Sequence, residues 1–326
     1  MNRRGPLQLS WHPAWTTVLQ QALKHVPYCL EVVTGEETRG FLALAHVRSI
    51  LFGRFLVSLP YVNYGGVVAD DENVYRLLVD HAVQLADELG VRHLELRQVQ
   101  GPPHPAFNQT RTDKVHMQLP LPETSEMLWA QLSAKVRNQI RKGQKNQFVP
   151  VWGREELLPD FYTVFSQNMR DLGTPVFGRK LFRSILRQFP ERAEFCVLRA
   201  ADRPVAAALL LHGWGITEVP SASSLREFNH TCANMLMYWL LLERSIERSQ
   251  AVFDFGRSSK DSNTVRFKKQ WGAEALQAEW QYYVRGGDVT DMRHDNPRYQ
   301  RFIRIWQRLP VAVTRWIGPA IVRGIP

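Results

Sequence analysis

Apolar residues in the first part of the chain alternate with polar ones in some stretches and recur at helical spacing in others. Helical spacing predicts a helix at residues 15–25 and a second one from Val74 to Leu89, which Gly90 ends as C-cap. The alternating stretches, which turns such as Thr34-Gly35 separate, predict strands. The predicted strands of this part are residues 28–33, 38–46, 54–58 and 91–97. Such an order indicates a mixed α/β domain, with helices covering a sheet.

A similar order of elements recurs in the second half of the chain. The predicted helices are residues 160–172, 179–188 and 234–248, and the predicted strands are residues 195–200, 204–212, 216–220, 252–255 and, as the closing strand, 279–284. A strand at 114–119 and a helix at 124–145, with Thr124 or Ser125 as N-cap, connect the halves. We therefore expect two α/β domains in tandem. The predicted parts are residues 1–122, a basic connecting helix at 123–147, a second domain at 148–290 and a tail at 291–326.

Composition supports folded domains and an acidic partner. Hydrophobic residues make up 44% of the 326 residues, which is enough for real cores and excludes a largely disordered chain. The net charge of +10 favours nucleic acid, phosphorylated metabolites or an anionic membrane as partners, and charge alone does not choose among them.

Cysteine and histidine are too scattered for a disulfide framework or a metal site. Cys29, Cys196 and Cys232 are far apart and form no CxxC pair, and no two histidines have ligand spacing, so we expect no metal. The N-terminus lacks the apolar core of a signal peptide, and the longest apolar run, residues 235–242, is too short to span a bilayer. We expect a cytoplasmic protein, with or without peripheral contact with the inner face of the membrane.

Residues 253–273, FDFGRSSKDSNTVRFKKQWGA, are the first candidate for chemistry. A short apolar strand opens here into a polar loop, which is a usual place for a binding site in α/β folds. The cations of this segment are Arg257, Arg266, Lys268 and Lys269. Some of them would face a phosphate or a developing oxyanion. The alternative is that Phe267 and Trp271 are core residues and that the lysines flank them in water.

Three further segments contain polar or basic residues in places where a ligand could bind. Residues 221–226 lead through a polar stretch into the start of a long helix, where free N–H groups can bind an anion, unless the hydroxyls only cap the helix. Residues 135–145 form a basic helix that either binds phosphates or is a solvated face. Residues 60–66, PYVNYGG, place aromatic residues beside glycines, as in a ligand contact or an aromatic-rich hairpin.

The tail has a pattern of its own, in which apolar residues recur at roughly helical spacing and Pro310 interrupts the run. These residues are Phe302, Ile305, Trp306, Leu309, Val313, Trp316 and Ile317. Seven arginines and one acid, Asp295, lie between Arg293 and Arg323. A basic amphipathic segment with tryptophans, here residues 294–326, either lies on an anionic membrane surface or packs on the protein body.

Four segments together resemble the Fem peptidyltransferase-like branch of the GNAT acyltransferase superfamily. They are RNQIRKGQK (137–145), NMRDLGTPVF (168–177), PSASSLREFNHTCANMLMYW (220–239) and residues 253–273. They look most similar to the FemAB-like proteins associated with exosortase/PEP-CTERM and exopolysaccharide systems. The resemblance covers roughly residues 30–285 and is strongest in the second half.

The resemblance implies two tandem GNAT-like domains, each a mixed sheet flanked by helices, and acyl transfer to an amine. Related enzymes transfer an aminoacyl group from aminoacyl-tRNA to the amine of a peptidoglycan precursor, and a Phe-Lys pair that matches Phe267-Lys268 lies at their reaction centre. By that resemblance, Lys268 would stabilise the oxyanion or the leaving group. With Arg257 from the cationic segment 253–273, it is a predicted catalytic residue. The predicted substrate-binding residues are Phe267, from that pair, and, from the candidate segments above, Arg141, Lys142, Asn138, Tyr64, Ser223, Ser224, Arg226, Asn234 and Tyr238.

Two departures leave the acyl donor open. The chain has no room for the helical arm that some Fem proteins insert, and the acetyl-CoA loop of simple GNAT enzymes is replaced by residues 232–236, CANML. We therefore expect no permanently bound cofactor, and either acyl-CoA or aminoacyl-tRNA as co-substrate.

The sequence thus supports an N-acyltransferase that acts on a phosphorylated or lipid-linked precursor of the cell envelope or of an exopolysaccharide. The alternative is a non-catalytic GNAT-like protein that docks at a membrane-associated complex through its basic tail. Nucleic-acid binding as the end function is less favoured, because the aromatic residues follow core-like patterns rather than forming a stacking platform.

Overall fold

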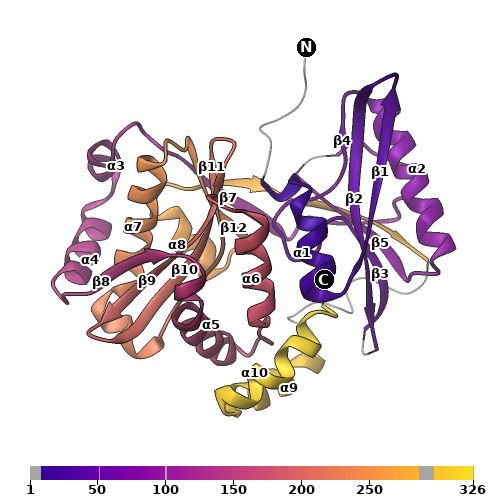
Figure 1. Ribbon diagram of the computed structural model, residues 1–326. Coiled ribbons are helices and arrows are strands. Elements are labelled where there is room, and N and C mark those ends of the chain that lie inside the picture. The colour runs from indigo at the N-terminus through magenta and orange to yellow at the C-terminus, as the bar shows by residue number, and fades with distance from the viewer. Residues whose placement is uncertain (1–8, 51, 100, 286–296, 326) are drawn as a thin grey trace. The chain divides into compact units, whose positions relative to one another are not determined.

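A computed structural model describes residues 9–50, 52–99, 101–285 and 297–325. The chain divides into two units, each built around one β-sheet with helices packed on it (Figure 1). The first unit comprises residues 1–115, 277–301 and 320–326, and the second comprises residues 116–276 and 302–319. The start of the predicted tail, residues 291–296, lies outside the described residues. Within the part of the chain that the structure describes, no helix is both long and apolar enough to cross a membrane.

The first sheet has the strand order β1–β2–β3–β5–β14–β6, with β4 paired to β2. Its strands are β1 (Val26–Thr34), β2 (Glu37–Ser49), β3 (Gly53–Val57), β4 (Val68–Ala69), β5 (His93–Gln98), β6 (Gln109–Arg111) and β14 (Glu279–Val284). Strands β3 and β5 are parallel, and the other paired strands are antiparallel. Two helices, α1 (Ala14–Leu23) and α2 (Glu72–Glu88), pack on this sheet.

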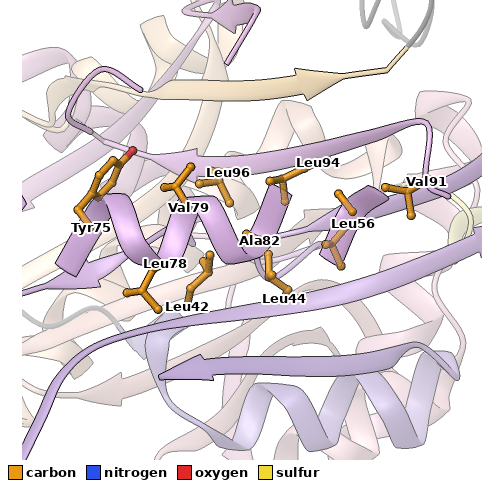
Figure 2. Close-up of a cluster of buried hydrophobic side chains, with 11 residues drawn as sticks. Leu42, Leu44, Leu56, Tyr75, Leu78, Val79, Ala82, Val91, Leu94 and Leu96 are labelled. Atoms are coloured by element: carbon orange, nitrogen blue, oxygen red, sulfur yellow. The ribbon is translucent and has the colours of Figure 1, made fainter. Parts of the chain in front are cut away.

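The core of the first unit lies between α2 and the sheet (Figure 2). Asp71 begins α2, where its side chain accepts a hydrogen bond from the main-chain N–H of Val74 at 2.9 Å. The buried residues of α2 recur three or four apart and so form one face of the helix. The buried residues of this cluster are Leu42, Leu44, Leu56, Tyr75, Leu78, Val79, Ala82, Ala86, Val91, Leu94 and Leu96. The helical spacing predicted for residues 74–89 is thus confirmed.

The second sheet has the strand order β13–β7–β12–β11–β10–β9–β8. Its strands are β7 (Lys114–Pro120), β8 (Val149–Gly153), β9 (Ala193–Ala200), β10 (Arg203–Gly213), β11 (Ile216–Ser224), β12 (Val252–Ser259) and β13 (Glu274–Gln277). The helices along this part are α3 (Ser125–Gln131), α4 (Ala134–Gln144), α5 (Leu158–Leu172), α6 (Arg179–Gln188), α7 (Ala233–Glu247) and α8 (Asn263–Lys269). Every residue of β10 from Val205 to His212 is buried, so both faces of the sheet are covered there, and α5 and α7 are the long helices that contact it.

Three sequence-based expectations need correction. The predicted helix at 124–145 is two helices, because Leu132 is extended and Ser133 caps a new helix by accepting from the N–H of Val136 at 3.3 Å. Strand β12 continues to Ser259 through residues predicted as loop. The predicted closing strand of the second half exists as β14, but it pairs with β5 and β6 of the first sheet. Alternation of polar and apolar residues identifies a strand without telling which sheet it joins.

The tail forms two helices, α9 (Pro297–Arg308) and α10 (Val311–Val322), separated at Pro310 as expected. Proline has no N–H and disfavours helical geometry in the residue before it, which explains the break.

Candidate functional site

Two parallel strands part in the middle of the second sheet. Strands β11 and β12 are paired only at Ile216–Val252, Thr217–Phe253 and Glu218–Asp254, although both continue for several residues. A register shift in the pairing with β10 leaves Val219 and Pro220 as a bulge in β11 just beyond the last of these pairs. Farther along, the facing main-chain groups of β11 and β12 are not paired with one another. Such an edge can accept an extended ligand through main-chain hydrogen bonds.

A buried carboxylate lies where the strands part. Asp254 is fully buried, and its side chain accepts hydrogen bonds from the main-chain N–H of Gly256 at 2.6 Å and from the amide of Gln118, on β7, at 3.1 Å. Gly256 has a φ of 75°, in the left-handed region that glycine adopts without a steric penalty. These contacts offset part of the cost of burying the charge and fix a sharp turn in β12.

Lys268 reaches this turn from α8. Ser262 caps α8 by accepting from the N–H of Val265 at 3.2 Å, and Val265 and Lys268, three residues apart, form the buried face of the helix. The Nζ atom of Lys268 donates to the main-chain oxygens of Gly256 at 3.0 Å and Arg257 at 3.3 Å. Its side chain is only 4% exposed.

The ammonium group of Lys268 has unusual electrostatics for a lysine. Burial lowers its pKa to about 8, the carboxylate of Asp254 raises it, and the guanidinium of Arg257 lowers it. Lys268 is therefore mostly charged at neutral pH and loses its proton near pH 8. His116 is buried on β7 and lies in the field of the same cations. Burial, and then the charges of Arg257 and Lys268, lower its pKa to about 3. Its imidazole is therefore neutral at physiological pH.

Aromatic side chains form the neighbourhood of the turn. Tyr238, on α7, stacks on Phe255 with ring centroids 5.6 Å apart and meets Phe267 edge-on at 4.9 Å. Trp271 lies 6.4 Å from Phe267 and is buried. Burial raises the pKa of Tyr238 to about 12, so its hydroxyl keeps its proton. The structure thus brings together four predicted site residues, which are Arg257, Phe267, Lys268 and Tyr238.

The predicted residues at the end of β11 have partners within the protein. Ser223 is buried and accepts a hydrogen bond from the amide of Asn168 at 3.1 Å, and Arg226 donates to the main-chain oxygen of Asp171 at 2.8 Å. Ser224 and Asn234 are half-buried. The serines are strand residues rather than helix caps; at the start of α7, the side chain of Cys232 makes no capping bond, and Oγ1 of Thr231 accepts from the N–H of Ala233 at 3.3 Å.

The basic helix α4 packs against the start of α7. A Cβ at Gly143 would lie 2.8 Å from Cβ of Leu236, and the amide of Asn146 donates to the main-chain oxygen of Thr231 at 3.2 Å. The predicted residues Asn138, Arg141 and Lys142 are exposed on α4. The exposed cations of this segment are Lys135, Arg141, Lys142 and Lys145, and none of them forms an ion pair with another described residue. Positive side chains therefore adjoin the start of α7, and the dipole of a helix favours anions at its N-terminus.

Tyr64 differs from the other predicted residues, because it belongs to the first unit and is only 2% exposed there. The two glycines beside Tyr64 are packed so closely against the protein interior that a side chain would not fit at either position. A Cβ at Gly65 would lie 2.4 Å from the main-chain oxygen of Ser58, and one at Gly66, whose φ is 90°, would lie 2.5 Å from Cγ of Gln98. This segment therefore has the properties of a packed aromatic turn.

The sequence-based reasoning did not include Gln118, His116 and Asp254 among the site residues. A signal was present for Asp254, since a lone acid between Phe253 and Phe255 in a short apolar strand has to be buried with partners. His116 and Gln118 occupy polar positions in a strand that was predicted, but nothing in the sequence indicates that this strand pairs with β12.

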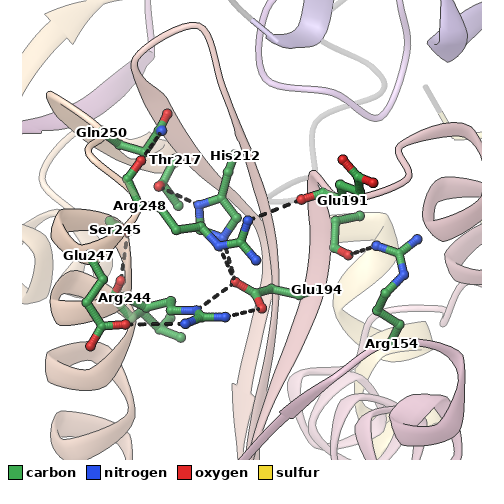
Figure 3. Close-up of polar contacts among 12 residues, drawn as sticks. Arg154, Glu191, Glu194, His212, Thr217, Arg244, Ser245, Glu247, Arg248 and Gln250 are labelled. Carbon is green, nitrogen blue, oxygen red and sulfur yellow. Dashed lines mark hydrogen bonds and ion pairs between the residues drawn. The ribbon is translucent and has the colours of Figure 1, made fainter.

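A second buried polar cluster surrounds Glu194 (Figure 3). Its carboxylate accepts from Nε2 of His212 at 3.0 Å and from Nε and Nη2 of Arg244, both at 3.0 Å, and it pairs with Nε of Arg248 at 3.0 Å. Burial alone would raise the pKa of Glu194, but the contacts with His212 and Arg244 outweigh it and lower the pKa to about 2. The other ring nitrogen of His212 lies 2.9 Å from Oγ1 of Thr217. This carboxylate, imidazole and hydroxyl resemble a nucleophilic triad, but Thr217 is fully buried, so the cluster braces β9, β10, β11 and α7.

Among the described residues, no group of three or more histidine, cysteine, aspartate or glutamate side chains is placed to hold a metal ion.

The candidate site lies in the part of the chain that matches a known protein family. Residues 130–269, which span the β11–β12 opening and Lys268, match the family described as Acetyltransferase (GNAT) domain. No curated protein sequence matches the chain significantly.

Solved structures extend the similarity to nearly the whole chain. FemX superimposes with a TM-score of 0.62 at 13% identity, covering 93% of this chain and 96% of FemX. The C-terminal domain of a putative lysylphosphatidylglycerol synthetase from Agrobacterium fabrum gives 0.57 at 11% identity, covering 86% and 89% of the two chains. A tandem GNAT protein from the clavulanic acid biosynthesis pathway gives 0.50 at 13% identity, covering 87% and 91%. The chain therefore has a mixed α+β fold that matches tandem GNAT-like folds.

Proposed function

We propose that the second unit transfers an acyl or aminoacyl group to an amine, with the reacting carbonyl beside Lys268. The observation that carries the proposal is a buried ammonium group at the point where two parallel strands part. Strands β11 and β12 do not pair with one another beyond Glu218 and Asp254, which suits an extended acyl donor, and the ammonium supplies positive charge where negative charge develops.

The proposed step needs no covalent enzyme intermediate. The amine nitrogen bonds to the acyl carbon, an oxyanion forms, and the carbon–sulfur bond of a thioester or the carbon–oxygen bond of an ester then breaks. The leaving thiolate or alkoxide takes up a proton, and the amine loses one. Two N–H groups of Lys268 donate to main-chain oxygens, and the third has no partner among the described residues, so it is available to the oxyanion. Donors of this kind contribute a factor of about 100–1,000 in rate.

The basic face of α4 supports a donor that contains phosphate. Lys142 lies on α4 and Lys145 is its C-cap, and α4 packs against α7, where the positive end of the α7 dipole and these cations both favour phosphate oxygens. Acyl-CoA and aminoacyl-tRNA share this chemistry, and both are retained as candidate donors.

We infer that the acceptor is an amine on a phosphorylated or lipid-linked precursor of the cell envelope or of an exopolysaccharide, used at the inner face of the cytoplasmic membrane. Support comes from the net charge of +10, from the sequence resemblance to exosortase-associated FemAB-like proteins, and from the likeness to the fold of a lysylphosphatidylglycerol synthetase domain. A phosphate-bearing acceptor suits a strongly cationic protein.

A donor survey tests the proposal. The full chain is incubated with acyl-CoAs, with aminoacyl-tRNA and with nucleotide-linked muropeptide or sugar acceptors, and transferred products are detected by mass spectrometry. Lys268→Met should slow transfer by about 100–1,000-fold, and Arg257→Ala should also lower it, while circular dichroism shows a retained fold. Lys269→Met is the matched control, because Lys269 is adjacent but exposed, and it should leave transfer unchanged. Full activity in both site variants would show that the site is assigned wrongly.

A further inference from the structure

Residues 302–319, which make up most of the two tail helices, belong to the second unit and pack on it by one face. Trp306 is 1% exposed, and the side-chain amide of Gln307 donates to the main-chain oxygen of Asp171, at the end of α5, at 3.1 Å. On α10, Nε of Arg315 donates to Oγ of Ser166, also on α5, at 2.7 Å. A Cβ at Gly318 would lie 2.9 Å from the main-chain nitrogen of Val176. Both helices therefore contact α5 or the segment that follows it, and their other faces point to solvent.

Those outer faces are unusually apolar. Trp316 is 82% exposed and Ile305 is 62% exposed, while Phe302 and Val313 are 41% and 37% exposed. Val313 and Trp316 are three residues apart on α10, as are Phe302 and Ile305 on α9, so each pair lies along one side of its helix. Exposed large apolar side chains that cluster, especially tryptophan, mark an interaction surface.

Cations accompany these apolar residues, and acids do not. Arg308 is exposed on α9, and residues 297–325 contain no acid. Arg179, at the start of α6, lies over the ring of Tyr162 at 4.9 Å, and Arg315 of α10 lies over the same ring at 5.6 Å, so α6 adds positive charge beside α10. Exposed tryptophan and isoleucine with flanking arginine match the interfacial region of an anionic bilayer, where apolar rings enter the headgroup boundary and cations meet phosphates.

We propose that the outer faces of α9 and α10 dock on an anionic lipid bilayer, with Trp316 and Ile305 inserted at the headgroup boundary. Each helix has 12 residues, which suits a helix lying in the interface and is far below the roughly 20 needed to span. The positive charge distinguishes this occupant from a second copy of the chain, because self-association would place the same arginines of two copies near one another. The proposal does not depend on acyl transfer.

Vesicle flotation of the full chain tests this docking. Vesicles of phosphatidylcholine with a minor fraction of phosphatidylglycerol should float the protein, whereas pure phosphatidylcholine should bind it much less, and raising the salt from about 0.1 M to about 1 M should weaken binding because the Debye length shrinks. Trp316→Glu and Ile305→Glu should each lower the partition coefficient about tenfold or more, since a charge replaces an inserted apolar side chain.

The matched control is Trp214→Glu, which changes an exposed tryptophan, 41% exposed, in the turn between β10 and β11. It should bind vesicles like the unchanged protein. Equal binding of Trp316→Glu, or equal binding to neutral and anionic vesicles, would overturn the proposal. So would a dimer in light scattering that Trp316→Glu dissociates, because a second copy would then cover this face.

Discussion

The carboxylate of Glu194 is expected to be a major source of stability in the second unit, and Glu194→Gln tests this. In the folded protein its pKa is about 2, against an ordinary value of 4.5, because His212 and Arg244 bind the charged form. Each unit of pKa corresponds to 1.36 kcal/mol, so the ionised form contributes about 3 kcal/mol. Water reaches Arg244 and Arg248, which are 30% and 33% exposed, and this reduces the expected loss to about 2–3 kcal/mol at pH 7.

The pH dependence separates this electrostatic effect from a packing defect. The folded-state pKa of Glu194 is depressed, so its contribution is complete above the unfolded pKa of 4.5 and is lost as the pH falls from there toward about 2. The difference in unfolding free energy between the unchanged protein and Glu194→Gln should therefore be constant from pH 7 to about pH 5 and should shrink at lower pH.

Native-state hydrogen exchange of the amides of β9 and β10 is the suitable assay, because it reports the stability of this sheet even if the two units unfold separately. Glu155→Gln is the matched control, since Glu155 forms an exposed ion pair with Arg183 at 2.6 Å that should contribute under about 1 kcal/mol. Equal losses in the two variants, or a loss for Glu194→Gln that stays the same at acid pH, would refute the reasoning.

Two further substitutions probe packing and the site. Gly143→Val should lower the free energy of unfolding by about 1–3 kcal/mol, because a Cβ there would lie 2.8 Å from Cβ of Leu236. Gln144→Val, on the exposed side of α4, should lower it far less, and urea unfolding of the two variants measures the difference. Asp254→Asn removes the carboxylate that raises the pKa of Lys268, so the lysine should lose its proton at a lower pH, which a 15N titration of the ammonium measures. An unchanged midpoint would contradict the electrostatic effect assigned to Asp254.

Most of the longer elements were predictable because each carries its own periodicity, whereas the short strands β6, β8 and β13 and the short helix α8 were not predicted. Helix α7 and strands β9 and β10 appear where spacing and alternation placed them. The sheet to which β14 belongs was not predictable, since pairing depends on contacts between residues far apart in sequence. The break at Ser133 was missed for a local reason: helical spacing continues across it, and only the hydroxyl that caps the new helix reveals it.

The candidate site was predictable only in part. The cationic cluster and the Fem-like Phe-Lys pair indicated Lys268 from sequence, and the structure places it beside Arg257 and Phe267. Its buried partners come from other strands, so the lowered pKa of Lys268 could not be inferred without the fold. Tyr64 illustrates the opposite case, in which a residue pattern typical of a ligand contact is explained by burial.

The role of the Lys268 ammonium group as the oxyanion partner is tested most directly by the pH dependence of transfer, once a donor and acceptor pair is identified. The rate constant kcat/KM of the unchanged protein should fall above about pH 8, where Lys268 loses its proton. Lys268→Met should be slower by about 100–1,000-fold and should lack that descending limb. A Lys268→Met variant that transfers at the unchanged rate, with the same descending limb, would contradict the account.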